Sequence, residues 1–151
     1  MLGKWLGEKQ EWAPLLLRVT LGVIFFAHGA QKVLGWYGGS GWAGTMQFFT
    51  QALHIPAPLA VLAFLTEFLG GAFLIVGLFT RWAALLLAGE MVVAALLVHL
   101  KSGFFMNWTN APNVGHGIEY NLALVGASLA LVLAGGGRFS LDGVMAKWRG
   151  W

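Results

Sequence analysis

Residues 59–79, LAVLAFLTEFLGGAFLIVGLF, decide the fold class of this chain, because they form a long apolar stretch with one charged residue, Glu67. A helix of about 20 residues is long enough to cross the hydrocarbon core of a bilayer. The whole chain of 151 residues shares this bias, with 58% hydrophobic and 10% charged residues, whereas soluble domains carry roughly a quarter of charged residues. The sequence therefore indicates an integral membrane protein and not a soluble enzyme.

Three further apolar stretches accompany this one, at residues 14–34, 82–100 and 118–133, the last being slightly short for a span. We predict an all-α membrane protein, a four-transmembrane-helix bundle in a single domain over residues 1–151. Thr80 and Arg81 leave room for a tight turn only, so the second and third helices should be antiparallel neighbours.

Both ends of the chain mix tryptophan with charged residues, in residues 1–12 and 140–151. Such segments are typical of short amphipathic interfacial helices with their tryptophans at the depth of the lipid headgroups. Residues 43–53 carry apolar side chains at helical spacing, and we expect them to lie in the outer interface. The predicted bundle thus has amphipathic helices at both termini.

The positions of lysine and arginine predict the orientation of the bundle, because cytoplasmic loops are enriched in them. The side that holds both termini carries most of them, Lys4, Lys9, Arg81, Arg138, Lys147 and Arg149. The other side carries Lys101, with Lys32 at its border. We therefore expect both termini in the cytoplasm. These residues are scattered and form no basic patch, so no nucleic-acid partner is expected.

Cysteine is absent from the chain. Disulfides, thiolate metal sites and thiol redox chemistry are therefore excluded for this chain alone. A redox role would need a bound cofactor or a partner protein.

Ionisable residues inside the predicted spans are the main functional signal, because each costs about 2.5–3.5 kcal/mol at a helix centre. The usual resolution is that such groups face one another inside the bundle. The predicted spans and their borders hold seven: Arg18, His28, Lys32, Glu67, Glu90, His99 and Glu119.

Helical geometry sorts these groups by face. Arg18, His28 and Lys32 fall within about 80° of arc on the first span. Glu67 shares a face with small residues, as does Glu119, and small residues allow close helix packing in lipid. We therefore expect both acidic faces to point into the bundle. The small residues are Ala63, Gly70 and Gly71 beside Glu67, and Ala123, Gly126 and Ala130 beside Glu119.

Depth along the spans divides the groups into two sets. Five of them should converge in the outer half of the bundle, beneath the loop 103–117, namely His28, Lys32, Glu67, His99 and Glu119. Arg18 and Glu90 should lie in the inner half, where they are candidates for a structural ion pair.

Several interpretations of the outer set remain open. It can be a purely structural network in which Glu67 and Glu119 neutralise Lys32 and His28. It can also be a site for a quinone or a similar lipid-soluble molecule, with proton exchange as its chemistry. The candidate catalytic residues are then Glu67, Glu119 and His28, and the candidate ligand-binding residues are Lys32, His99, Asn107, Trp108, Tyr120 and Asn121, with Phe104 and Phe105 in the apolar wall.

A metal site is a weaker alternative, with His28, Glu67, His99 and Glu119 as ligands of a first-row metal. The paired Glu-x-x-His spacing of di-iron bundles is missing from this chain. Proton or ion conduction is the remaining alternative, although four spans form a pathway poorly without oligomerisation.

Several sequence blocks together resemble the DoxX family of bacterial membrane proteins over about residues 13–142. The blocks cover residues 18–32, the stretch 64–71 (FLTEFLGG), the stretch 77–81 (GLFTR), the stretch 103–108 (GFFMNW), the stretch 117–121 (GIEYN) and the stretch 135–142 (GGGRFSLD). The matching polar positions are His28, Lys32, Glu67, Asn107, Glu119 and Asn121.

The resemblance implies a four-helix bacterial inner-membrane protein. Some family members are subunits of a thiosulfate:quinone oxidoreductase, and others are associated with oxidative-stress complexes that include a superoxide dismutase and a sulfurtransferase. We therefore expect a redox-associated subunit, with a soluble or membrane redox partner or a second copy of the chain as partners. Whether this chain catalyses a step of such an oxidoreductase itself is left open. The runner-up is a non-catalytic membrane anchor or scaffold, followed by a small-solute or proton transporter.

Overall fold

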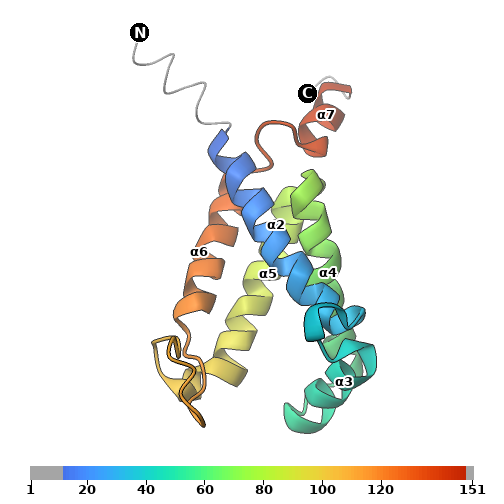
Figure 1. Ribbon diagram of the computed structural model, residues 1–151. Helices are drawn as coiled ribbons and strands as arrows, with labels where there is room; N and C mark the ends of the chain where they lie inside the picture. The colour runs from blue at the N-terminus through green and yellow to red at the C-terminus, as the bar shows by residue number, and fades with distance from the viewer. Residues whose placement is uncertain (1–11, 149–151) are drawn as a thin grey trace.

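Four long helices run alternately in opposite directions through the computed structural model, which describes residues 12–148 (Figure 1). They are α2 (Trp12–Val33), α4 (Ala57–Val76), α5 (Thr80–Ala94) and α6 (Glu119–Ala134). A π-helical turn, η3 (Ala95–His99), and a 3-10 turn, η4 (Leu100–Ser102), extend α5 to Ser102.

Three of these helices are long and apolar enough to cross a membrane, Trp12–Val33, Ala57–Val76 and Thr80–Ser102, while α6 is a shorter apolar helix. The prediction of an all-helical fold is confirmed, since residues 12–148 contain no strand. That α6 also spans the bilayer, which would make four spans, stays a prediction.

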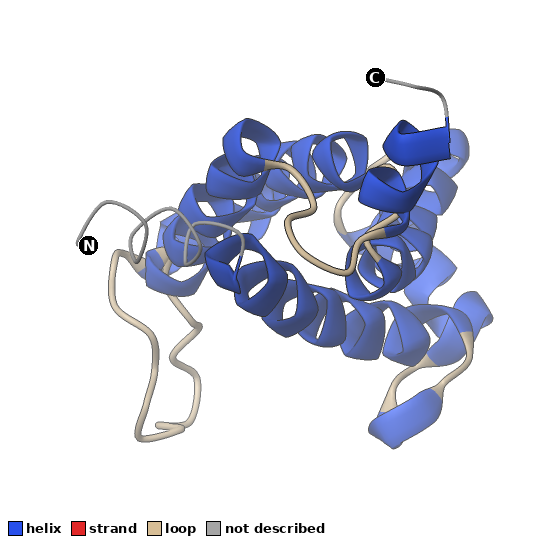
Figure 2. Cartoon of the chain, turned by 90° about the horizontal axis from the view of Figure 1, so that it is seen from above, coloured by secondary structure: helices blue, strands red, loops and turns tan. Residues whose placement is uncertain are grey.

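The two ends of the bundle differ in what they carry. The loop end holds η1 (Trp36–Gly38), α3 (Gly41–Gln47), the π-helical turn η2 (Phe48–Ala52) and the loop 103–118. The terminal end holds the turn 77–79, the segment 135–140 and the short helix α7 (Leu141–Trp148). Seen along the bundle, the α3 segment and the loop 103–118 project on opposite sides (Figure 2).

The described residues include only part of the two segments predicted to form terminal helices. Residues 1–11 and 149–151 lie outside the described residues. The structure has a short helix, α7, near the C-terminal end, with Asp142 in its first turn and Lys147 in its last. That α7, like α3, lies in a membrane interface stays a prediction.

The turn between α4 and α5 lies earlier in the sequence than predicted, at residues 77–79. α4 ends at Val76, and Gly77 adopts a left-handed conformation with φ 71°, which glycine accepts without steric cost. The N–H groups of Gly77 and Leu78 then donate to the carbonyl oxygens of Leu74 and Phe73. Thr80, predicted to lie in the turn, is already the first residue of α5.

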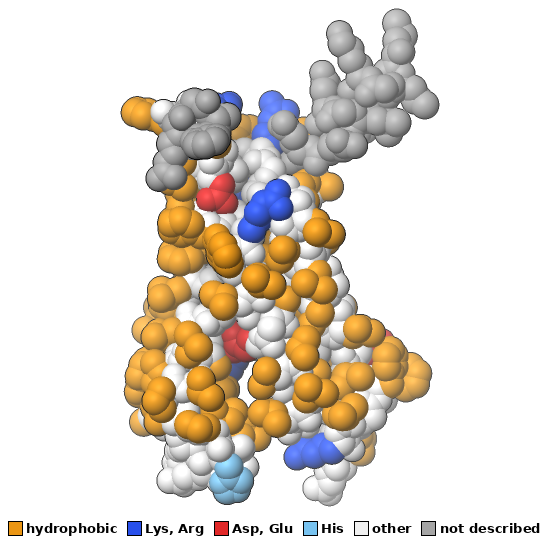
Figure 3. Space-filling view, turned by 180° about the vertical axis from the view of Figure 1, so that it is seen from behind, with side chains coloured by type: hydrophobic (Ala, Val, Ile, Leu, Met, Phe, Trp, Pro, Cys, Tyr) orange, Lys and Arg blue, Asp and Glu red, His pale blue; other side chains and the backbone are white. Residues whose placement is uncertain are grey.

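Helix packing places a narrow apolar core between the helices. α2 packs mainly on α4 and α5 mainly on α6, while α4 and α5 join the two pairs. The core includes Leu21, Phe25, Leu74, Leu87 and Leu131. Many large apolar side chains point outward instead, and hydrophobic side chains cover most of the middle of the face in Figure 3. This distribution suits lipid, which removes the need for a polar surface.

The expected inward face of α6 is wrong. Ala123, Gly126 and Ala130 are exposed, and a Cβ added to Gly126 would meet nothing within 4 Å. The buried side chains of α6 are Asn121, Leu124, Ser128 and Leu131. The small residues thus line the outer surface, because bulkier leucines on the opposite side of the helix fill the space against α5.

Candidate functional site

A partly buried ion pair joins α2 to α4. Lys32, in the last turn of α2, donates a hydrogen bond from Nζ to Oε2 of Glu67, in the middle of α4. The two side chains are 26% and 6% exposed. Within residues 12–148 this is the only ion pair between side chains. The expectation that Lys32 and Glu67 meet is thus met.

Glycines bring the two helices close enough for this pair to form. A Cβ added to Gly29 would lie 2.4 Å from Cα of Phe68, and one added to Gly71 would lie 2.4 Å from the backbone nitrogen of Phe26. The backbones of α2 and α4 are therefore in direct contact at these positions, as small residues allow in membrane helices. The predicted packing role of Gly71, beside Glu67, agrees with this contact.

Glu90 adds a second carboxylate to the pair from α5. Its charge interacts with those of Glu67 and Lys32. Its Oε2 atom is buried and has no hydrogen-bond partner among the described residues. Glu90 therefore lies near the Lys32–Glu67 pair without forming an ion pair with Lys32, and we name these three residues the mid-bundle cluster. In Figure 3, an acidic and a basic side chain adjoin in a recess of the otherwise apolar middle.

Glu90 was not expected in this cluster, although the distances of Glu67 and Glu90 from the turn between α4 and α5 could have predicted it. Glu67 lies ten residues before Gly77, and Glu90 lies ten residues after Thr80 (77 − 67 = 90 − 80). Positions equally far from the turn of an antiparallel helix pair share the same depth. At 1.5 Å per residue, both carboxylates lie about 15 Å from the turn.

The predicted ion pair between Arg18 and Glu90 is not formed. Arg18 is 1% exposed, and its guanidinium donates to backbone carbonyls only. The acceptors are Leu74 (3.0 Å), Ile75, Gly136 (2.9 Å), Arg138 (3.3 Å) and Phe139 (3.0 Å). Arg18 instead ties the last carbonyls of α4 to the segment 136–139, because helix ends leave carbonyls without partners.

Glu119 does not join the mid-bundle cluster either. Its Oε2 accepts a hydrogen bond of 3.0 Å from the backbone N–H of Met106. Asn107 acts in the same loop, donating from Nδ2 to the carbonyls of Ala111 (3.0 Å) and Val114 (2.8 Å). Both residues hold the loop 103–118 against the start of α6.

The histidines also lie apart from the cluster. His28 is exposed, and Nδ1 of His99 lies 2.9 Å from the carbonyl oxygen of His116. No group of three or more His, Cys, Asp or Glu residues within residues 12–148 is placed to hold a metal ion. The weaker metal alternative, His28 with Glu67, His99 and Glu119, is therefore not assembled.

The remaining candidate ligand-binding residues are dispersed. Trp108 is 76% exposed in the loop, and Tyr120 is also exposed. Asn121 is buried, and its Nδ2 lies 3.8 Å from the sulfur of Met91. The structure thus separates the predicted outer set: Lys32 and Glu67 lie in the mid-bundle cluster, Glu119 and His99 contact the loop 103–118, and His28 is exposed.

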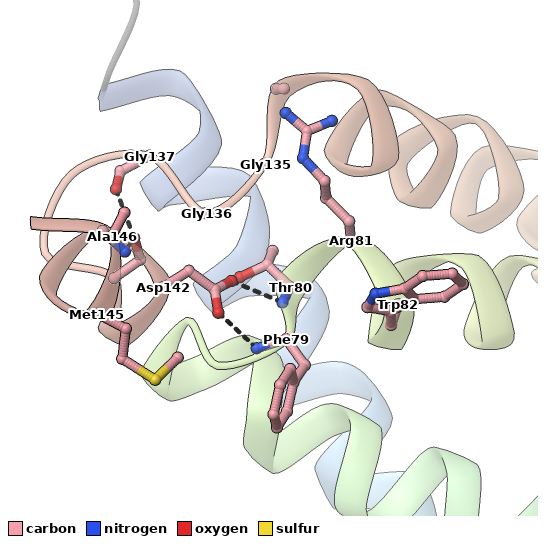
Figure 4. Close-up of a pocket in the computed structure, with 13 residues that line it drawn as sticks. Phe79, Thr80, Arg81, Trp82, Gly135, Gly136, Gly137, Asp142, Met145 and Ala146 are labelled. Atoms are coloured by element: carbon pink, nitrogen blue, oxygen red, sulfur yellow. Dashed lines mark hydrogen bonds between the residues drawn. The ribbon is translucent and has the colours of Figure 1, made fainter. Parts of the chain in front are cut away.

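A cavity of about 550 Å³ lies at the terminal end, bordered by the start of α5, the segment 134–137 and α7 (Figure 4). Asp142 accepts hydrogen bonds there from the N–H groups of Phe79 (2.7 Å) and Thr80 (2.8 Å), so it caps the N-terminus of α5. Sequence analysis missed this cavity. Its signals were the glycines at 135–137 and the single acidic residue of the C-terminal segment.

Comparison with known proteins fits this architecture. Residues 13–100 match the model of the DoxX family. The chain is 33% identical to "Putative oxidoreductase CatD" of Bacillus subtilis, over 91% of this chain and 90% of the relative. It is 30% identical to "Inner membrane protein YqjF" of Escherichia coli, over 91% and 95%. No solved structure matches the chain. The chain is a membrane protein and belongs to the DoxX family.

Proposed function

We propose that this protein is a redox-associated subunit of the bacterial inner membrane that binds a quinone or a similar lipid-soluble ligand beside the mid-bundle cluster. The observation that carries the proposal is the partly buried Lys32–Glu67 pair with a second carboxylate nearby, Glu90, whose Oε2 atom lacks a partner among the described residues. The oxidoreductase name of the Bacillus subtilis relative supports the redox part.

The second carboxylate favours function over a purely structural role. One lysine and one glutamate suffice to fix the register of α2 against α4. Glu90 adds another group that costs about 2.5–3.5 kcal/mol at a helix centre. A pair of carboxylates beside one ammonium group can take up and release a proton, and intramembrane proton relays use such residues.

The chemistry of quinones fits such a cluster. Reduction of a quinone to a quinol takes up two electrons and two protons. The mid-bundle cluster would pass protons to the ligand, and the electrons would come from a redox partner, since the chain has no thiols of its own. The depth of the cluster, in the apolar middle of the helices, is where a lipid-soluble ligand can reach it.

A ligand-induced thermal shift tests this proposal. A short-chain ubiquinone or menaquinone analogue should raise the unfolding temperature of the purified wild type in detergent. Glu90→Gln removes the extra carboxylate and leaves the Lys32–Glu67 pair, so the variant should fold and lose most of the shift. Glu119→Gln is the matched control, because it removes a carboxylate that binds the loop 103–118 and lies outside the cluster. This variant should keep the thermal shift.

The runner-up function, a non-catalytic anchor or scaffold, predicts a different result. Glu90→Gln would then raise the stability of the protein, because it removes a buried ionisable group, and no quinone would shift the unfolding temperature of any variant. That outcome would exclude the ligand site. Transport, the third alternative, predicts proton or solute flux into sealed liposomes that contain this protein alone.

We further propose that the terminal end faces the cytoplasm. Lys32, at the border of the loop end, forms the ion pair with Glu67. Lys101 is therefore the remaining described lysine or arginine of that end. Besides the buried Arg18, the described basic residues of the terminal end are Arg81, Arg138 and Lys147, and such asymmetry marks the cytoplasmic side.

Because the chain has no cysteine, single introduced cysteines report the orientation directly. In intact spheroplasts, an impermeant maleimide should label Val114→Cys in the loop 103–118 and leave Met145→Cys on α7 unlabelled. The opposite labelling would reverse the proposed orientation.

A further inference from the structure

The cavity at the terminal end is separate from the mid-bundle cluster and has features of a second ligand site. It lies at the first turn of α5, about 15 Å along that helix from Glu90. Two stretches distant in sequence form its walls, namely the start of α5 and the stretch 134–146, which contains the glycine run 135–137 and most of α7 (Figure 4).

A buried hydroxyl without a partner lines this cavity. Thr80 is 0% exposed, and its Oγ1 atom has no hydrogen-bond partner among residues 12–148. This oxygen faces the glycine run, because a Cβ added to Gly136 would lie 2.9 Å from it. Buried hydroxyls are almost always hydrogen-bonded. A polar atom of a ligand in the cavity would supply the hydrogen-bond partner that the Thr80 hydroxyl lacks.

Arg81 supplies a cation beside the same glycine run. Its Nη1 atom donates to the carbonyls of Val132 and Leu133, at the end of α6. Its Nε and Nη2 atoms have no acceptor in the part of the chain that the structure describes, and a Cβ on Gly135 would lie 3.2 Å from Nη2. Arg81 can therefore still donate two hydrogen bonds in the paired geometry that suits a phosphate.

The acidic residue of the cavity does not cancel this charge. Both oxygens of Asp142 accept N–H groups at the start of α5, and its charge interacts with that of the buried Arg18. Figure 4 shows Asp142 directed at the turn, whereas Arg81 extends toward Gly135. The guanidinium of Arg81 is thus the charge left for a ligand, which favours an anion.

The rim of the cavity suits lipid. Phe79 is 55% exposed and Trp82 is 69% exposed, and tryptophan is typical of the headgroup region. The cavity lies where α5 begins and α6 ends, at the end of the apolar bundle. In a bundle that spans the membrane, this is the depth of the lipid headgroups. Basic pockets between membrane helices are known to bind the headgroups of anionic lipids.

We propose that this cavity binds the phosphodiester of an anionic phospholipid, with Arg81 and the hydroxyl of Thr80 as its donors. The inference goes beyond the proposed redox role and does not depend on it. A phospholipid held there would join α5, α6 and α7 at the membrane surface.

The test measures phospholipid affinity of the full chain by native mass spectrometry, with phosphatidylglycerol added in detergent. Thr80→Val keeps the shape of the side chain and breaks no described hydrogen bond, so it should fold and lower the affinity about tenfold. Arg81→Gln should lower it more, on the order of thirtyfold. Ser128→Ala is the matched control, because Ser128 Oγ is a second buried hydroxyl without a partner, outside this cavity.

Ser128→Ala should leave the affinity for phosphatidylglycerol unchanged. Equal affinity of the wild type and Thr80→Val would overturn the proposal. So would binding of inorganic phosphate that is lost in Arg81→Gln while phosphatidylglycerol does not bind the wild type, because the ligand would then be free phosphate. Weaker retention of phosphatidylcholine than of phosphatidylglycerol by the wild type would support the choice of an anionic lipid.

Discussion

The terminal end and the middle of the bundle differ in how completely their ionisable side chains are hydrogen-bonded. At the terminal end, Arg18 donates to five backbone carbonyls and Asp142 accepts two backbone N–H groups. In the middle, Glu67 pairs with Lys32, Glu90 lies near this pair, and one oxygen of Glu90 has no partner among the described residues. Fully hydrogen-bonded charges hold a structure together, whereas charges left incompletely paired indicate a site that acts on something else.

The largest effect on stability should follow from Arg18→Met, which keeps an unbranched apolar side chain and removes the guanidinium. The change leaves carbonyls of α4 and of the segment 136–139 without donors in a buried place, and breaking such a network costs about 3–5 kcal/mol. The free energy of unfolding in detergent should fall accordingly. Arg138→Met, an exposed arginine of the same end, is the control and should change it little. Equal losses in both variants would contradict the role assigned to Arg18.

A smaller effect should follow from Gly29→Ala. Its new Cβ would lie 2.4 Å from the backbone of Phe68, so α2 and α4 must separate, at a cost of about 1–3 kcal/mol. Gly126→Ala is the control, because a Cβ there meets nothing within 4 Å. Since alanine favours helix over glycine, that variant should gain about 0.5–1 kcal/mol. Thermal unfolding of both variants measures the contrast, and a loss in Gly126→Ala would show that the exposed face of α6 is covered by something else.

The fold could be predicted from the sequence to a large extent, because length and hydropathy determine where apolar helices occur. Glycine explains both the turn at Gly77 and the contacts between α2 and α4, because it adopts a left-handed conformation without strain and lets helices approach closely. The inward face of α6 was wrong, because small residues mark a close approach in some helices and an outer surface in others. Only the neighbouring side chains distinguish the two cases.

The candidate site was predicted less well. The meeting of Lys32 and Glu67 followed from depth and helical face. Arg18 was assigned the wrong partner, because a backbone carbonyl carries no signature in the sequence, although it accepts an arginine as readily as a carboxylate does. Glu119 was assigned to the cluster on depth alone, whereas the fold of the loop 103–118 places the N–H of Met106 within its reach.

The central claim is that the carboxylates of the mid-bundle cluster exchange protons with a bound quinone, and infrared difference spectroscopy of that cluster tests it most directly. Reduction of a quinone analogue bound to the purified protein should produce a carboxyl difference band in the wild type and in Glu119→Gln, and Glu90→Gln should lose it. A spectrum without any carboxyl band in the wild type, or a band that survives in both Glu90→Gln and Glu67→Gln, would contradict the account.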